Sequence, residues 1–110
     1  MNPEALDIYL VRGGTFGLEV EYQDTQGALV PFVGWSGESE VRDVDLNLFL
    51  TLAVVLTNPG IITLSATDEA TEAMPPGGRA GWDLFLNDPA GNRWPVLAGL
   101  AFIRDARTQR

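Results

Sequence analysis

Two segments of the chain contain residue types that could support catalysis. Ser36 lies in the sequence Gly-Trp-Ser-Gly-Glu, which differs from the G-x-S-x-G nucleophile elbow in having Glu38 at the last glycine position. A serine nucleophile needs a general base, and the chain contains no histidine. Glu38 and Glu40 lie two residues apart on one face of a predicted strand, where a carboxylate pair could act in a glycosidase, but such pairs are common on the solvated face of an acidic protein. We predict no catalytic residue and no enzymatic activity.

Two other segments could bind a cofactor or an ion. Gly13, Gly14 and Gly17 follow a predicted strand, but their spacing is not that of a dinucleotide-binding loop, and the next residues alternate as a strand. The glycines therefore favour a tight turn between strands. Asp43 and Asp45 could bind calcium together with a loop carbonyl, but they lack EF-hand spacing. We predict no cofactor and no metal site.

Each of the three tryptophans could hold a sugar ring if its side chain were exposed. Trp82 and Trp94 share strand parity with neighbouring apolar residues, which predicts that both lie in the core. Trp35 has a glycine directly before it and another two residues later, so it is the tryptophan that we consider for exposure. Trp35 is therefore the candidate glycan-binding residue, and a carbohydrate-binding module is one alternative function.

Composition and charge exclude several classes of partner. The chain has 110 residues, 45% hydrophobic and 20% charged, which is the size and composition of one folded domain covering residues 1–110. Fifteen acidic residues and seven arginines, with no lysine, give a net charge of -8, which repels phosphate backbones and anionic membranes. The amino terminus lacks a secretory signal, and the longest apolar stretch, residues 46–56, is shorter than a membrane-spanning helix. We expect no nucleic-acid partner and no membrane partner.

Turn signals and apolar alternation predict an all-β fold. Residues 24–27 (Asp-Thr-Gln-Gly) and 88–91 (Asp-Pro-Ala-Gly) suit hairpins with a type I turn and a left-handed glycine, and residues 58–60 (Asn-Pro-Gly) suit a type II turn. One short helical turn is predicted at residues 68–74, with Asp68 as its cap. Short strands separated by such turns indicate a β-sandwich. The predicted strands cover residues 7–11, 16–22, 29–33, 36–43, 47–57, 61–66, 80–87 and 93–104.

Two predicted strands are apolar on both faces. In residues 46–57 one face is mostly leucine while the other contains Phe49 and Val55, and residues 93–104 show the same property. In a two-layer sandwich the outer face of each sheet is exposed to solvent, and no long helix is predicted to cover it. Apolar residues on such a face therefore indicate a protein–protein interface. A β-bulge that shifts the parity, with Gly99 as the obvious position, is the alternative. The candidate interface residues are Phe49, Val55, Phe85, Leu97 and Ile103.

Short motifs follow one another in a characteristic order over about residues 8–103. They are Gly13-Gly14-Thr15-Phe16, Asp24 to Gly27, Phe32-Val33-Gly34, Arg42, Gly60 to Leu64, Thr67 to Gly77, Trp82-Asp83-Leu84, Asp88 to Gly91 and Gly99. In this order the chain resembles a family of tail-associated bacteriophage domains, namely the N-terminal domain of baseplate upper proteins and similar β-sandwich domains of tail fibres. Gly14 stands where that family usually has Asp, and residues 46–55 are more apolar than in the family, so the chain resembles a distant relative.

The resemblance implies an immunoglobulin-like Greek-key β-sandwich with a non-enzymatic role in a virion. We expect a structural protein of the tail or baseplate, an adaptor or a tail-fibre attachment domain, whose partners are other virion proteins and further copies of itself. A capsid decoration protein with the same sandwich is a second alternative. Because the sequence ends at Arg110, no receptor-binding domain is expected to follow, and Arg104, Arg107 and Arg110 form a basic tail that could meet an acidic neighbour.

Overall fold

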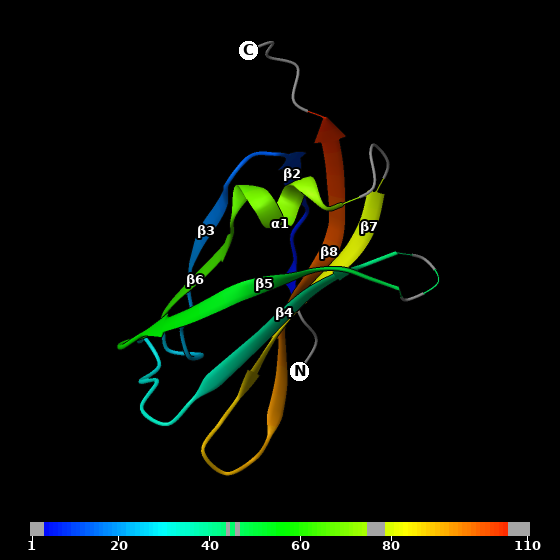
Figure 1. Ribbon diagram of the computed structural model, residues 1–110. Coiled ribbons are helices and arrows are strands. Elements are labelled where there is room, and N and C mark those ends of the chain that lie inside the picture. The colour runs from blue at the N-terminus through cyan, green and yellow to red at the C-terminus, as the bar shows by residue number, and fades with distance from the viewer. Residues whose placement is uncertain (1–3, 44, 46, 75–78, 106–110) are drawn as a thin grey trace.

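The structure is a computed structural model, and it describes residues 4–43, 45, 47–74 and 79–105. Most of this part of the chain is β-strand, with one short helix (Figure 1). The elements are β1 (Glu4–Ala5), β2 (Ile8–Arg12), β3 (Phe16–Glu21), β4 (Ser36–Arg42), β5 (Leu48–Thr57), β6 (Ile61–Ala66), α1 (Asp68–Glu72), β7 (Arg79–Asn87) and β8 (Arg93–Asp105). The all-β prediction is confirmed, and except at residues 29–33 each predicted strand is present to within one residue at each end.

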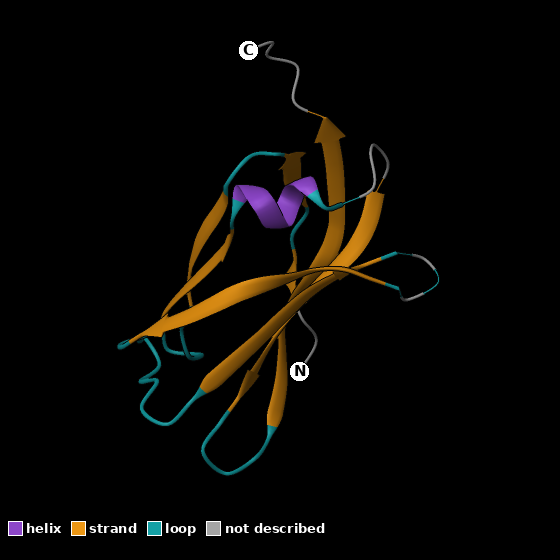
Figure 2. Cartoon of the chain, viewed as in Figure 1, coloured by secondary structure: helices purple, strands orange, loops and turns teal. Residues whose placement is uncertain are grey.

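The strands form one curled sheet in the order β1-β8-β7-β4-β5-β6-β3, with β2 also paired to β8. β5 belongs to both halves of the curl, because residues 48–52 pair with β4 and residues 53–57 pair with β6. Figure 2 shows the long strands β5 and β4 running across the molecule, with β3 and β6 on one side of them, while β7 and β8 cross them. The inner faces of the two halves enclose one apolar core.

The core follows from the alternation of apolar residues along each strand. Leu10, Ile62, Leu64, Leu84 and Leu86 are fully buried, and each is flanked by less buried neighbours on its strand. The helix α1 contributes to one end of the core. In the described residues, no helix is long and apolar enough to cross a membrane.

A β-bulge in β8 decides which of its side chains face the core. Leu84 pairs with Leu97 while Phe85 pairs with Pro95, so Val96 is an extra residue in β8. Val96 and Leu97 are consecutive and both buried, at 8% and 5% exposure. The alternation of inward and outward side chains therefore shifts by one residue at this point. The sequence left a β-bulge in this strand as an alternative, with Gly99 as its predicted position. The structure has the bulge earlier in the strand, at Val96.

Gly99 has a different role, which is to let the N-terminal segment pass close to β8. A Cβ atom at Gly99 would overlap the carbonyl oxygen of Leu6, which lies between β1 and β2. The same carbonyl accepts a hydrogen bond from Trp82 Nε1 at 2.7 Å. The backbone N–H of Leu100 donates to Asp7 Oδ1 at 3.0 Å. These contacts fix β1 and β2 against β8, to which both strands run parallel.

The hairpin loops share one arrangement, in which an aspartate closes its own loop. Oδ1 of Asp24 and of Asp88 accepts hydrogen bonds from the backbone N–H groups two and four residues further on. Gly27 and Gly91 have φ of 83° and 90°, which confirms the predicted left-handed glycines. Asp43 makes the same pair of contacts in the loop between β4 and β5, so this carboxylate, considered above for calcium, also serves to close a loop.

Residues 29–33 do not form a strand, and that prediction is wrong. An isolated bridge joins Gln23 to Leu29, after which the backbone leaves the ladder. The N–H of Phe32 donates to the side chain of Asn58 at 3.0 Å rather than to a neighbouring strand, and a proline in the segment has no N–H to donate. The apolar side chains that suggested a strand instead anchor a loop, since Phe32 is 5% exposed.

In the turn at residues 58–60, the peptide bond between Asn58 and Pro59 is cis, and Gly60 has the positive φ, 69°, that the predicted type II turn requires at this position. One detail of the helix differs from the prediction. The N-cap of α1 is Thr67 rather than Asp68, because the Thr67 hydroxyl accepts the hydrogen bond from the N–H of Ala70.

Candidate protein interface

The predicted interface residues lie at very different depths. Val55 is 56% exposed, Phe49 and Phe85 are half-buried, and Leu97 and Ile103 are buried at 5% and 3% exposure. The expectation that Leu97 and Ile103 lie on an outer face is therefore wrong, because the bulge in β8 turns both side chains inward. Both side chains belong to the apolar core.

The half-buried aromatic residues are covered within the chain. Phe49 is the extra residue of a second bulge, since Val41 pairs with Leu50 while Arg42 pairs with Leu48, and Phe49 packs against the core. Phe85 lies under the guanidinium of Arg93, whose Cζ is 3.8 Å from the ring centroid.

An exposed apolar surface lies instead on the outer face of β2 and β8. We call it the outer patch, and it consists of Tyr9, Val11, Leu100 and Phe102. Tyr9 is 56% exposed, Val11 42% and Leu100 38%. The rings of Tyr9 and Phe102, which are register partners, stack with centroids 5.2 Å apart. The guanidinium of Arg104 lies 5.2 Å from the Tyr9 ring centroid, so a positive charge borders the patch.

The described residues around the outer patch leave it open. Gly81 pairs with Leu100 in the neighbouring strand β7 and has no side chain to cover it. β2 pairs with β8 on one side, and no described strand pairs with its other edge. A sheet edge with exposed apolar side chains beside it favours contact with another chain.

The sequence contains one signal for the outer patch. Residues 8–11, Ile-Tyr-Leu-Val, are apolar at both parities, so this strand has the same property as the two longer strands. This strand has only five residues, so its two apolar faces are less evident than those of the longer strands. Strict alternation along residues 93–104 puts Leu100 on the same face as Val96, whereas the bulge at Val96 leaves Val96 buried and Leu100 exposed.

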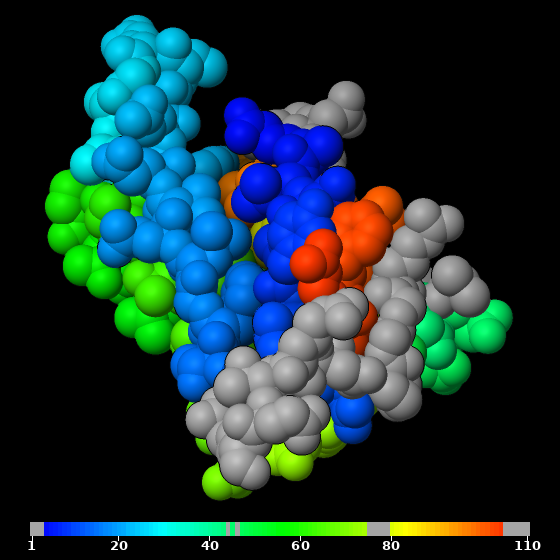
Figure 3. All heavy atoms as spheres, turned by 90° about the horizontal axis from the view of Figure 1, so that it is seen from above, coloured from blue at the N-terminus to red at the C-terminus, as the bar shows by residue number. Residues whose placement is uncertain are grey.

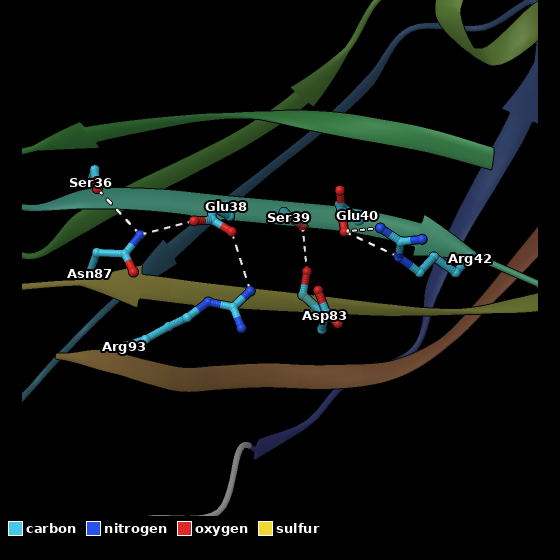
Figure 4. A network of polar contacts seen from close by, with 8 residues as sticks. All are labelled: Ser36, Glu38, Ser39, Glu40, Arg42, Asp83, Asn87 and Arg93. Atoms are coloured by element: carbon cyan, nitrogen blue, oxygen red, sulfur yellow. Dashed lines mark hydrogen bonds and ion pairs between the residues drawn. The ribbon is translucent and has the colours of Figure 1, made fainter. Parts of the chain in front are cut away.

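The rest of this outer face carries a polar ladder on β4, β7 and β8 (Figure 4). Glu38 forms an ion pair with Arg93 at 3.2 Å, and Glu40 forms one with Arg42 at 2.7 Å. Glu40 also lies directly opposite Asp83, whose pKa is raised by partial burial and then by the charge of Glu40. The carboxylates Glu38 and Glu40, considered above for catalysis, are thus held by arginines of the ladder.

Trp35 and Trp94 contribute to a second feature, an open groove of about 760 Å³ between β3 and the β1–β8 edge. We call it the aromatic groove. Trp35 is half-buried and packs edge-on against Tyr22, with centroids 6.5 Å apart. Trp94 is also half-buried rather than in the core as predicted, and its Nε1 donates to Asp88 Oδ2 at 3.0 Å. Trp82 lies in the core at 3% exposure, as predicted.

Carboxylates surround the apolar residues of the aromatic groove. The remaining lining residues are Glu4, Val20, Glu21, Gln23, Asp24, Thr25, Val30, Val96 and Leu97, together with Tyr22 and Asp88. None of the lining residues is an arginine. In Figure 3 the light-blue β3 and its hairpin lie on one side and the dark-blue N-terminal segment on the other, with orange atoms of β8 visible between them. In the described residues, no group of three or more metal-binding side chains is present.

Comparison with known proteins identifies no family. No protein-family model matches the sequence, and no curated protein matches it. Among solved structures, the chain is similar to the crystal structure of the Lin-41 filamin domain, with a TM-score of 0.49 and 15% sequence identity, covering 87% of this chain and 82% of that chain. This similarity carries no information on function.

Proposed function

We propose that this chain is a non-enzymatic structural domain that works by protein–protein assembly, in the tail or baseplate of a bacteriophage. The observation that supports assembly is the outer patch, where Tyr9, Val11 and Leu100 expose 38–56% of their surface beside a sheet edge with which no described strand pairs. Covering apolar surface contributes about 25 cal/mol per Å², so a partner that fits this face gains affinity from it. The partners we propose are other virion proteins and further copies of the chain.

The virion setting is supported by the order of motifs along the sequence. The structure gives several of these motifs a definite role, which is consistent with their recurrence in a family. Gly27 and Gly91 adopt positive φ in hairpin loops, and Gly99 makes room for the N-terminal segment. Trp82 at the start of the Trp-Asp-Leu motif fixes that segment through its hydrogen bond to Leu6.

The proposal includes an immunoglobulin-like Greek-key sandwich as the fold. In immunoglobulin domains the strands D, E and B form one sheet, and C, F and G form the other. The neighbours β5-β6-β3 and β4-β7-β8 follow the same order here, with β2 parallel to β8 at the edge. The strand β5, which pairs with both β4 and β6, joins the two layers.

Sedimentation velocity over a concentration series tests the assembly role. We expect the intact chain to associate, or as a monomer to bind an apolar dye, and Leu100→Ser to weaken either effect about tenfold. Val33→Ser is the matched control, because Val33 is 75% exposed but lies in a loop away from the outer patch. A chain that stays monomeric at every concentration and binds no dye would overturn the proposal.

The virion setting needs a separate test. Gold-labelled antibodies against the chain are expected to mark the tail or baseplate in electron micrographs of purified phage particles. Labelling of the capsid surface would identify a decoration protein instead, and unlabelled particles would rule out a virion role while leaving assembly to be explained in another setting.

A carbohydrate-binding module is the second candidate, because Trp35 and Trp94 line one groove together with carboxylates. Aromatic faces and hydrogen-bond acceptors in a groove of this size suit a small polar ligand. A glycan array tests this function, and Trp35→Ala should abolish any signal without unfolding the chain. The absence of any glycan signal from the intact chain would remove this candidate.

A further inference from the structure

We propose that the aromatic groove of one copy receives the arginine-rich C-terminal segment of another copy. This inference rests on the proposed assembly role, and it names the partner and the second contact surface. It starts from the chemistry of the groove, which combines aromatic faces with an acidic rim.

The groove offers two kinds of contact to one type of side chain. Trp35, Tyr22 and Trp94 supply half-buried aromatic rings, while Glu4 and Glu21 are exposed carboxylates at the rim. A guanidinium is planar, stacks on aromatic faces and pairs with carboxylates, so an arginine satisfies both contacts at once. A groove with these residues and without a cation among its lining residues therefore favours an arginine-containing segment.

The chain itself contains such a segment. All seven of its cationic residues are arginines, and Arg104, Arg107 and Arg110 lie within the last seven positions of the sequence. Elsewhere, Arg42 and Arg93 form ion pairs with glutamates of the polar ladder. Residues 104–110 thus concentrate positive charge in a chain whose net charge is -8.

A copy cannot place this segment in its own groove. The groove touches β8 at Trp94, Val96 and Leu97, near the start of the strand, whereas β8 continues to Asp105. The strand from Leu97 to Asp105 spans about 26 Å, and the residues after Asp105 reach at most about 17 Å when fully extended. Figure 1 shows the C-terminal end of β8 beside the end of β2, at the other end of β8 from its hairpin with β7.

The contact must therefore join the end of one copy to the groove of the next. Such a head-to-tail contact is heterologous, and repetition of it builds a ring if the rotation closes or a filament if it does not. Both outcomes are compatible with a structural role. The outer patch lies on a different face, since its residues belong to the outer surface of β2 and β8.

A peptide titration tests the groove directly. The probe is a synthetic peptide with the sequence of residues 105–110, Asp-Ala-Arg-Thr-Gln-Arg. The signal is the tryptophan fluorescence of the intact chain, two of whose three tryptophans, Trp35 and Trp94, line the groove. We expect a saturable change below about 5 mM, which is the range of effective concentrations in linked assemblies. A peptide with both arginines replaced by serine should give no saturable change.

Substitutions at the rim separate the groove from general charge attraction. Combining Glu4→Gln with Glu21→Gln should weaken peptide binding at least about fivefold, because both carboxylates border the site. Glu19→Gln is the matched control, since Glu19 is exposed on the same strand but does not line the groove. A chain that shows no saturable change, or that loses as much affinity with Glu19→Gln as with the double variant, would overturn the inference.

Association of the full chain distinguishes this inference from the proposed function. Arg107→Ser combined with Arg110→Ser should weaken association measured by sedimentation, as Leu100→Ser should. If Leu100→Ser weakens association while the arginine variant leaves it unchanged, the groove contact is wrong and the assembly role stands. If only the arginine variant weakens association, the outer patch is wrong and the groove contact stands.

Discussion

Asp83 and Glu40 lie directly opposite each other on β7 and β4, both on the outer face of the sheet. Like charges in this position repel, and the pKa of Asp83 is raised by partial burial and by Glu40. The ion pairs of Glu40 with Arg42 and of Glu38 with Arg93 surround this contact. The outer face of the sheet therefore divides into a polar ladder with internal repulsion and an apolar outer patch.

The charge of Asp83 should reduce stability at neutral pH. Because its pKa is raised in the folded state, the stability associated with its protonated form is present at low pH and is lost as the pH rises through the folded pKa. Asp83→Asn should raise the free energy of unfolding at pH 7 by about 0.5 kcal/mol. This increase in the free energy of unfolding should shrink when the pH is below the ordinary pKa of aspartate. Urea unfolding at both pH values measures it, with Glu19→Gln as the control for removing one negative charge.

Gly99 should tolerate no side chain. A Cβ atom there would overlap the backbone of Leu6, so Gly99→Ala should displace the connection between β1 and β2 and lower stability by about 2 kcal/mol or more. Gly81→Ala is the matched control, because Gly81 pairs with Leu100 in the same two strands and the nearest atom to its Cβ would be 3.9 Å away. Equal urea midpoints for the two variants would contradict this account of Gly99.

The Asp88 carboxylate should stabilise its hairpin in a pH-dependent way. Its pKa is lowered, first by the hydrogen bond from Trp94 and then by those from its own loop. The stability that it contributes is therefore present above the ordinary pKa of 3.8 and lost as the pH falls through the lower folded pKa. Asp88→Ala should lower the urea midpoint at pH 7, and this difference should narrow in acid. Asp45→Ala, in the exposed part of another loop, should change the midpoint little at either pH.

The sequence predicted the elements well and their inward faces less well. The Asp-x-x-Gly hairpins and the strand at residues 61–66 follow from turn chemistry and strict alternation, which are local properties. The inward face of β8 depends on the bulge at Val96, whose position is set by pairing with β7. Pro95, directly before it, is a local signal for a bulge, but strict alternation alone does not use it. For this reason Leu97 and Ile103 were predicted on the wrong side.

The candidate sites depended even more on long-range contacts. Trp35 and Trp94 lie far apart in the sequence, and only the curl of the sheet brings them to one groove. The outer patch joins Tyr9 to Phe102 through a parallel pairing that no turn signal announces. Apolar side chains do lie outside the core, as the two doubly apolar strands predicted. Of the five predicted interface residues, however, only Val55 is exposed.

Thiol accessibility in the assembled state tests the role of the outer patch most directly. The chain has no cysteine, so a single cysteine at position 100 reports on the patch, and one at position 33 reports on an exposed loop. We predict that, as assembly proceeds with rising protein concentration or in the phage particle, the maleimide reaction of Leu100→Cys slows at least about tenfold while that of Val33→Cys does not change. Equal reactivity of Leu100→Cys in the monomer and in the assembled state would show that the outer patch remains uncovered, and the proposed role of the patch would then be wrong.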